Sequence, residues 1–148
     1  MAVSASGMFV ANLVDILDAT QLAVDLSLTT NKVALFTNSI TPNFDSDVGY
    51  GAAPYNANEV SGTGYTAGGV AVASPTVTGA SGNVTYDIAD TSWSSSTITN
   101  ARAALIYANA LTNKNGIVLV NLGADYSTVN GTFSIVWSAS GVLVLDVA

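Results

Sequence analysis

The chain contains no cysteine and no histidine among its 148 residues, and only three of them are basic. Without cysteine, the fold cannot depend on disulfides or on thiolate–metal sites. Without histidine, hydrolytic catalysis would rest on carboxylates or on a Ser–Lys pair. Neutralising phosphates takes clusters of basic residues, so the three dispersed cations Lys32, Arg102 and Lys114 argue against nucleic acid as a direct partner.

Charge of either sign is scarce. Charged residues make up 9% of the chain and hydrophobic residues 49%, and the net charge is −7, whereas about a quarter of an ordinary soluble domain is charged. A lone monomer of this size normally carries more charge on its surface. Either much of the surface is covered by other protein, or it is coated with Ser, Thr and Asn.

Long apolar runs are also missing. The run over residues 7–17 is short and Asp15 interrupts it, whereas a membrane span needs about 20 apolar residues. A secretory leader needs a basic start, and the first positive charge is Lys32. We therefore expect no membrane partner.

The start of the chain has a helical pattern. Residues 8–18 (MFVANLVDILD) predict an amphipathic helix of about three turns, with Ser6 as its N-cap. The residues on its apolar face are Phe9, Leu13, Ile16 and Leu17, and those opposite are Asn12, Asp15 and Asp18. The apolar stripe must be buried, either in its own sheet or against a neighbouring protein, so residues 1–20 are expected to be an N-terminal helix or arm.

The rest of the chain has the period of β-strands. Expected strands cover residues 21–28, 33–37, 70–74, 84–88, 97–108, 117–122, 132–137 and 143–147. Asn115-Gly116 and Asn130-Gly131 are typical of tight hairpin turns, and Ser140-Gly141 is a weaker signal of the same kind. The last four strands should therefore form an antiparallel meander. We expect one domain over residues 1–148, mainly β: an antiparallel β-sandwich or a jelly-roll-like fold with one short N-terminal helix.

Residues 39–69 form a long irregular segment rich in Gly and Tyr, of the kind that is generally functional or mobile. Its four aromatic rings are either contacts with another protein, a role that suits tyrosine, or anchors lying on the domain's own sheet. We take them, with two residues of the helix, as interface candidates. The candidates are Phe44, Tyr50, Tyr55, Tyr65, Phe9 and Leu13.

A dinucleotide-binding pattern occurs at Gly62-x-Gly64-x-x-Ala67. That chemistry needs a strand before the glycines and a helix after them, but here an irregular segment precedes them and a β-favouring run follows. The glycines instead predict a tight, bulged loop entering a strand, and no cofactor is expected.

The remaining polar candidates have structural explanations. Asp in turns bonds its own backbone, which accounts for the close pairs Asp45/Asp47 and Asp87/Asp90. The Asp45-x-Asp47 pattern lacks the other ligands of a calcium loop. We therefore expect no catalytic residues, no metal site and no enzyme. Arg102 should find a carboxylate partner, Asp87 or Asp90 or one from another subunit.

Trp93 and Trp137 lie beside and within the expected strands, and we expect both to be buried core anchors.

Four blocks of sequence resemble a family of small virion structural proteins of tailed bacteriophages. They are residues 32–42 (KVALFTNSITP), 58–74 (NEVSGTGYTAGGVAVAS), 86–107 (YDIADTSWSSSTITNARAALIY) and 123–145 (GADYSTVNGTFSIVWSASGVLVL). The resemblance implies a component of the virion, and the small size favours a capsid decoration (cement) protein on the outside of the head. Such a protein binds the major capsid protein, usually as a homotrimer, and stabilises contacts between capsid subunits.

Two alternatives remain open. Within virions, the protein could be a structural component of the tail or of the fibre base. In a different class, it could be a carbohydrate-binding β-sandwich module, for which an exposed Trp or Tyr would have to line a groove.

Overall fold

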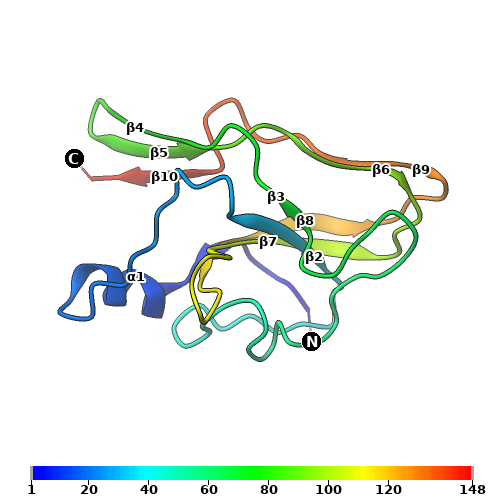
Figure 1. Ribbon diagram of the computed structural model, residues 1–148, viewed down its shortest axis with the longest axis horizontal. Helices are drawn as coiled ribbons and strands as arrows, with labels where there is room; N and C mark the ends of the chain where they lie inside the picture. The colour runs from blue at the N-terminus through cyan, green and yellow to red at the C-terminus, as the bar shows by residue number, and fades with distance from the viewer. Residues whose placement is uncertain (1, 148) are drawn as a thin grey trace.

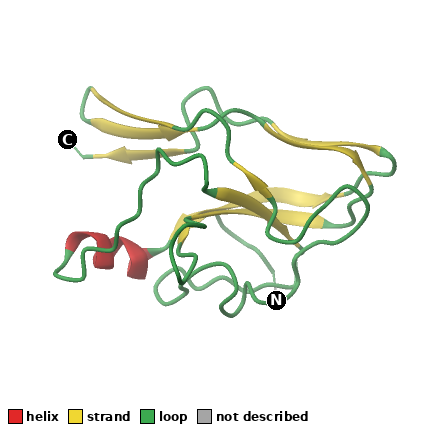
Figure 2. Ribbon diagram, in the orientation of Figure 1, coloured by secondary structure: helices red, strands yellow, loops and turns green. Residues whose placement is uncertain are grey.

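The computed structural model describes residues 2–147 and shows a mainly-β fold with one short helix (Figures 1 and 2). Strands account for 38% of the chain and helix for 5%, which confirms the expected fold class. In chain order the elements are β1 (Gly7–Met8), α1 (Val10–Leu17), β2 (Lys32–Phe36), β3 (Val70–Ala71), β4 (Thr76–Ala80), β5 (Asn83–Asp87), β6 (Thr91–Ser96), β7 (Ala101–Tyr107), β8 (Gly116–Tyr126), β9 (Gly131–Ile135) and β10 (Leu143–Asp146).

The strands form two layers. A five-stranded sheet in the order β1-β8-β7-β2-β3 makes the first. The second consists of a three-stranded sheet, β10-β5-β4, and a two-stranded sheet, β6-β9, which follow one another along the long axis in Figure 1. Every strand pair is antiparallel. The arrangement is sandwich-like, with the second layer divided in two.

The five-stranded sheet is buried on both faces. On one face, Val33, Leu35 and Ile106 belong to a core cluster shared with Trp93 and Phe133 of the second layer. On the other face, neighbouring residues of the same strands form a second cluster with the N-terminal segment and the segment 39–69. This second cluster consists of Val3, Phe9, Ala34, Phe36, Ile40, Tyr55, Ala103, Leu105, Tyr107 and Leu119. Burial on both faces explains why β7 is almost continuously apolar.

The strand expected over residues 21–28 is absent. Val24 and Leu26 pack against the core, as their alternation predicted. However, the segment has no neighbouring strand, because the carboxylate of Asp25 accepts hydrogen bonds from the amide and the hydroxyl of Ser27 and turns the chain. The alternation of apolar and polar residues here therefore indicates an extended connection with one buried side, and not a strand of a sheet.

The strand expected over residues 97–108 begins only at Ala101, because residues 97–100 connect β6 to β7. β6 ends at Ser96 and β7 begins at Ala101, so the two strands lie in different layers. Asn100 has a φ of 56° and breaks the extended conformation between them. β6 was not predicted, and neither was β4. The latter pairs with β5 across a turn in which Ser81 and Gly82 both have positive φ, the geometry of a tight hairpin.

The prediction of a four-stranded meander is wrong beyond its first pair. β7 and β8 are neighbours, but β9 pairs with β6 and β10 pairs with β5. In this arrangement Phe133 and Ile135 of β9 join Trp93 of β6 in the core between the layers. A local turn signal at Asn130, whose φ is 48°, cannot specify which strand becomes the next neighbour.

The helix is shorter than expected, and a residue expected on its solvent side is buried. It starts after Phe9 and not after Ser6, whose hydroxyl instead accepts the amide of Asn121. Asn12, expected in solvent, is 4% exposed. Its side-chain amide donates to the carbonyl oxygens of Val48 at 2.6 Å and Gly116 at 2.9 Å. A polar residue thus ties the helix to its own domain.

Candidate interaction surfaces

The aromatic rings of the segment 39–69 turn toward the domain. Tyr55 is 2% exposed and Phe9 is 1% exposed, and their ring centres lie 5.6 Å apart. Neither ring is accessible to a partner in this conformation, so we correct the expectation of an interface for these two. Phe44 and Tyr50 are half-buried against the same cluster, which favours the alternative that the rings anchor the segment.

The other two interface candidates are also half-buried. Tyr65 packs against the core between the layers, with its ring centre 5.9 Å from that of Trp93. Leu13 lines a groove described below. Partner contacts by these residues stay a prediction.

Glu59, which the sequence analysis did not single out, organises the segment. Its carboxylate accepts hydrogen bonds from the hydroxyls of Tyr50 at 2.9 Å and Tyr65 at 2.7 Å, and from the amide of Gly68 at 2.7 Å. The carbonyl of Gly68 in turn accepts the hydroxyl of Tyr107 at 2.9 Å. The only glutamate of the chain therefore joins three parts of the segment to one another, and Gly68 links them to Tyr107 of β7.

Burial and this carboxylate together raise the pKa of the surrounding phenols. Burial is the larger cause at Tyr50, and the hydrogen bond and charge of Glu59 add to it and bring the pKa to about 12. Burial also raises the pKa of Tyr107, which stacks on Tyr50 with ring centres 4.7 Å apart. The Nζ of Lys114 lies 5.2 Å from the centre of the Tyr50 ring. Glu59, Tyr50, Tyr65, Gly68 and Tyr107 therefore form a structural cluster, which we call the clamp.

The glycines of the segment permit close backbone contacts. Gly69 has a φ of 71°, and a Cβ there would collide with the carbonyl oxygen of Val33. A Cβ on Gly62 would collide with the carbonyl of Thr97. β3 begins directly after Gly69, so the tight loop entering a strand is confirmed.

The predicted acidic pairs have structural partners. Asp47 is 8% exposed and accepts the amide of Asn43 at 2.8 Å, while the Asn43 side chain accepts the amide of Asp45 at 3.2 Å. Asp87 and Asp90 accept the amides of Ile88 and Trp137. The carboxylates of Asp47 and Asp87 therefore bond nearby backbone, as the sequence predicted, whereas Asp90 bonds a distant segment and Asp45 takes part through its amide.

Arg102 is paired with neither of the expected acids. Its Nε donates to Asp125 at 2.7 Å, between β7 and β8, and the two side chains are 21% and 39% exposed. The wide irregularity in the pairing of these strands brings the two residues together. Trp93 is buried, as expected, whereas Trp137 is half-buried and donates its indole N–H to Thr91 at 3.1 Å.

Helix α1 presents apolar residues to solvent. Val10, Val14 and Leu17 follow one another at helical spacing and are 44%, 53% and 78% exposed. We call these three residues the outward stripe. Next to this stripe, Leu13 and Ile16 line a groove of about 180 Å³ whose far wall is β10. The apolar surface of the helix is therefore wider than its own domain covers.

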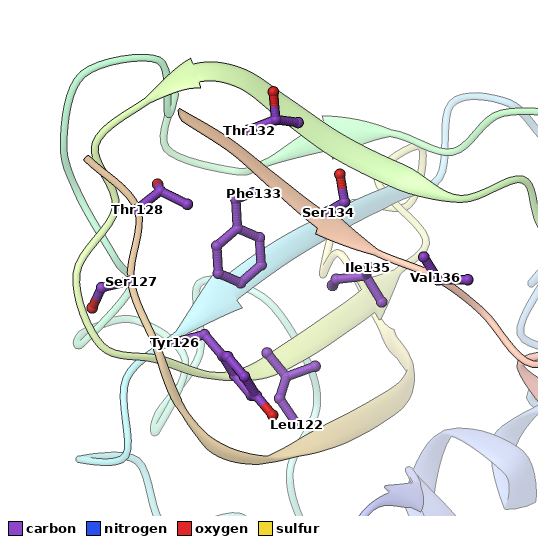
Figure 3. Close-up of a pocket in the computed structure, with 9 residues that line it drawn as sticks. All are labelled: Leu122, Tyr126, Ser127, Thr128, Thr132, Phe133, Ser134, Ile135 and Val136. Atoms are coloured by element: carbon purple, nitrogen blue, oxygen red, sulfur yellow. The ribbon is translucent and has the colours of Figure 1, made fainter. Parts of the chain in front are cut away.

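A trough of about 360 Å³ runs along β9 (Figure 3). Leu122 and Tyr126 of β8 form one wall, and β9 forms the other. In Figure 3 the side chains of Thr132 and Ser134 point away from the ring of Phe133, so these two residues line the trough through their backbones. The lining contains hydroxyl and apolar groups and no charged residue.

Among residues 2–147, no group of three or more acidic side chains could hold a metal ion. Over the same residues, no helix is long and apolar enough to cross a membrane. Compared with known proteins, the chain matches no family model, no curated protein and no solved structure.

Proposed function

We propose that the protein is a structural component of a tailed-bacteriophage particle: a decoration protein that binds the outer surface of the head and stabilises contacts between major capsid subunits. The observation that carries the proposal is the outward stripe of α1. An amphipathic helix normally turns its apolar residues toward its own domain, yet α1 leaves Val10, Val14 and Leu17 exposed to solvent. These exposed residues are suited to a second protein surface.

Two further features support this function. The sequence resembles small virion structural proteins in four blocks, of which one contains Glu59, Tyr65 and Gly68 of the clamp. The surface carries few charges and a net charge of −7, which suits a position on the outside of the shell, away from packaged DNA. Binding would bury apolar area against two or more coat subunits and so oppose expansion of the shell.

Copy number separates a decoration protein from a tail component. Densitometry of purified virions against the major capsid protein should show hundreds of copies per particle. A handful of copies would instead place the protein in the tail or the fibre base, and its absence from purified virions would reject the proposal.

The role of the outward stripe can be tested by substitution. Val14→Asp combined with Leu17→Asp should reduce occupancy on particles that lack the protein and leave the thermal midpoint of the free subunit nearly unchanged. Burying such a side chain stabilises a contact by roughly 1.5–3 kcal/mol, so each change should weaken binding about tenfold or more. Val129→Asp is the matched control. The exposed fraction of Val129, 81%, is close to the 78% of Leu17, and Val129 lies outside the stripe.

A carbohydrate-binding role has one observation in its favour. Tyr126 is 50% exposed and lines the trough beside β9, as that alternative requires. The other five tyrosines are buried or half-buried. Titration with oligosaccharides, monitored by chemical-shift changes, should then show perturbations at Tyr126 that Tyr126→Ala abolishes. Without such perturbations, this second function fails.

A further inference from the structure

The outer strands of the three sheets differ in how their edges are protected. Exposed edges can template pairing with another chain, and proteins usually block them with charges, shortness or cover. In the five-stranded sheet the outer strands β1 and β3 have only two residues each. β10 carries Asp146. The outer edge of β6 is covered by the segment 62–64, where the amide of Thr97 donates to Thr63 at 2.8 Å. Within residues 2–147, β4 and β9 have none of these protections.

The free edge of β9 is the one that faces the trough. On the β6 side, the carbonyl of Gly131 accepts the hydroxyl of Ser96, and the amide of Trp137 donates to Asp90. Backbone groups alternate in direction along a strand. The N–H and C=O groups of Thr132 and Ser134 therefore point away from β6, into the trough shown in Figure 3.

β4 offers a matching edge. All five of its residues are exposed, and β5 is its one neighbour. Ala80 and Asn83 flank the two-residue turn and pair directly, as the hydrogen-bonded pair that closes such a hairpin. By the same alternation, the backbone groups of Val77 and Gly79 point outward.

We propose that β4 of one copy pairs with the free edge of β9 on a second copy, so that the two small sheets join into one continuous sheet across the interface. In an antiparallel pairing, Val77 faces Ser134 and Gly79 faces Thr132, because these are the residues whose backbone groups are free. The occupant of the trough is then an extended, uncharged strand of the same length as β9.

The distribution of charge favours a second copy as the occupant. Two copies with a net charge of −7 repel one another wherever acidic residues meet. Neither β4 (TVTGA) nor β9 (GTFSI) contains a charged residue, and none lines the trough. Pairing through these strands therefore brings the copies together at places that carry none of the ten acidic side chains.

The pairing is head-to-tail, because the donor and acceptor edges differ. In Figure 1, β4 and β9 lie at opposite ends of the upper layer. Contacts of this kind generate a closed ring when the rotation between copies closes. A ring agrees with the homotrimer expected for the decoration protein, but the pairing does not depend on a capsid, and free protein is sufficient to test it.

Cysteine pairs provide the test, because the chain has no cysteine of its own. Directly paired residues of this type have Cα atoms about 5.5 Å apart, within the range that a disulfide needs. Val77→Cys combined with Ser134→Cys should give mostly covalently linked dimers and larger species on a non-reducing gel after mild oxidation. The control is Val144→Cys with Ser134→Cys, since Val144 is 45% exposed, against 46% for Val77, but lies on β10. The control should stay mostly unlinked.

Charge provides a second, independent test. Val77→Lys and, separately, Ser134→Lys should shift the protein in light scattering from an oligomer to the 15.0 kDa mass of a single chain, while Val144→Lys should not. Equal cross-linking of both cysteine pairs, or a wild-type chain that is monomeric at high concentration, overturns the proposal. A protein that pairs in this way but is absent from virions would reject the capsid function and leave the pairing intact.

Discussion

The hydroxyl of Tyr65 donates a hydrogen bond of 2.7 Å to the carboxylate of Glu59 and accepts one of 2.9 Å from the amide of Leu35. Through these two bonds, Glu59 and Tyr65 of the irregular segment 39–69 are fastened to the buried strand β2. A long loop carries a large ordering entropy, roughly 1–2 kcal/mol per residue for the backbone. Buried rings and the Glu59 carboxylate together offset part of that cost.

Glu59→Gln should therefore destabilise the protein. A carboxylate accepts all three of its hydrogen bonds, whereas the amide group of glutamine would direct its own N–H groups at one or more of the same donors. We expect the free energy of unfolding in urea to fall by about 1–3 kcal/mol. Asp45→Asn, which removes a negative charge from an exposed position of the same segment, is the control and should be nearly neutral. Equal effects would show that net charge matters and the clamp does not.

The sequence predicted the positions of many strands but not which strands are neighbours in the sheets. Alternation identified β5, β9 and β10, and the apolar run in β8 predicted burial on both sides. The same rule produced a false strand at Val24 and Leu26, because an extended connection with one buried side has the period of a strand. Which strands become neighbours depends on long-range burial, such as that of Phe133 beside Trp93, and no local signal reports it.

The clamp was hidden for a related reason. Glu59 lies in a segment without regular structure, and its role arises from Tyr50, Tyr65 and Gly68, whose positions follow from the fold. The clearest signal available was that a chain with nine aspartates has a single glutamate inside a glycine-rich block. Phe9 and Tyr55 were expected at an interface because aromatic composition alone does not distinguish a contact residue from a loop anchor.

Two buried tyrosines should respond in opposite ways to loss of the hydroxyl. Tyr107 and Tyr86 are each 1% exposed, but only the Tyr107 hydroxyl has a protein partner, the carbonyl of Gly68 at 2.9 Å. Tyr107→Phe leaves that buried carbonyl unpaired and should lower the free energy of unfolding by about 1–3 kcal/mol. Tyr86→Phe removes a hydroxyl without a partner and should be neutral or slightly stabilising. Urea denaturation of the two variants measures both effects. A larger loss of unfolding free energy for Tyr86→Phe than for Tyr107→Phe would contradict the hydrogen-bond assignment.

Stability should fall in alkaline solution. Burial, with nearby carboxylates, raises the pKa of both Tyr50 and Tyr86 to about 12 from the ordinary value of 10.0. Between these values the unfolded chain releases protons that the native chain keeps, so the free energy of unfolding decreases as pH rises. The contribution is fully present below about pH 10 and is lost through about pH 12. Urea midpoints measured across this window should fall, and less steeply in Tyr86→Phe. A flat profile would contradict the burial of these phenols.

Two glycines with similar positive φ angles should differ in their tolerance of a side chain. Gly69 and Gly51 have φ values of 71° and 87°, so alanine at either position costs about 1–2 kcal/mol of backbone strain. At Gly51 nothing lies within 4 Å of the added Cβ, whereas at Gly69 it would meet the backbone carbonyl of Val33 in the buried strand β2. Because backbone cannot move aside as a flexible side chain can, Gly69→Ala should lose a further 1–3 kcal/mol or so. Thermal midpoints of the two variants compare the effects directly. Equal midpoints would mean that β3 can leave the edge of the sheet without cost, and that the glycines serve the turn and not the close approach of the two strands.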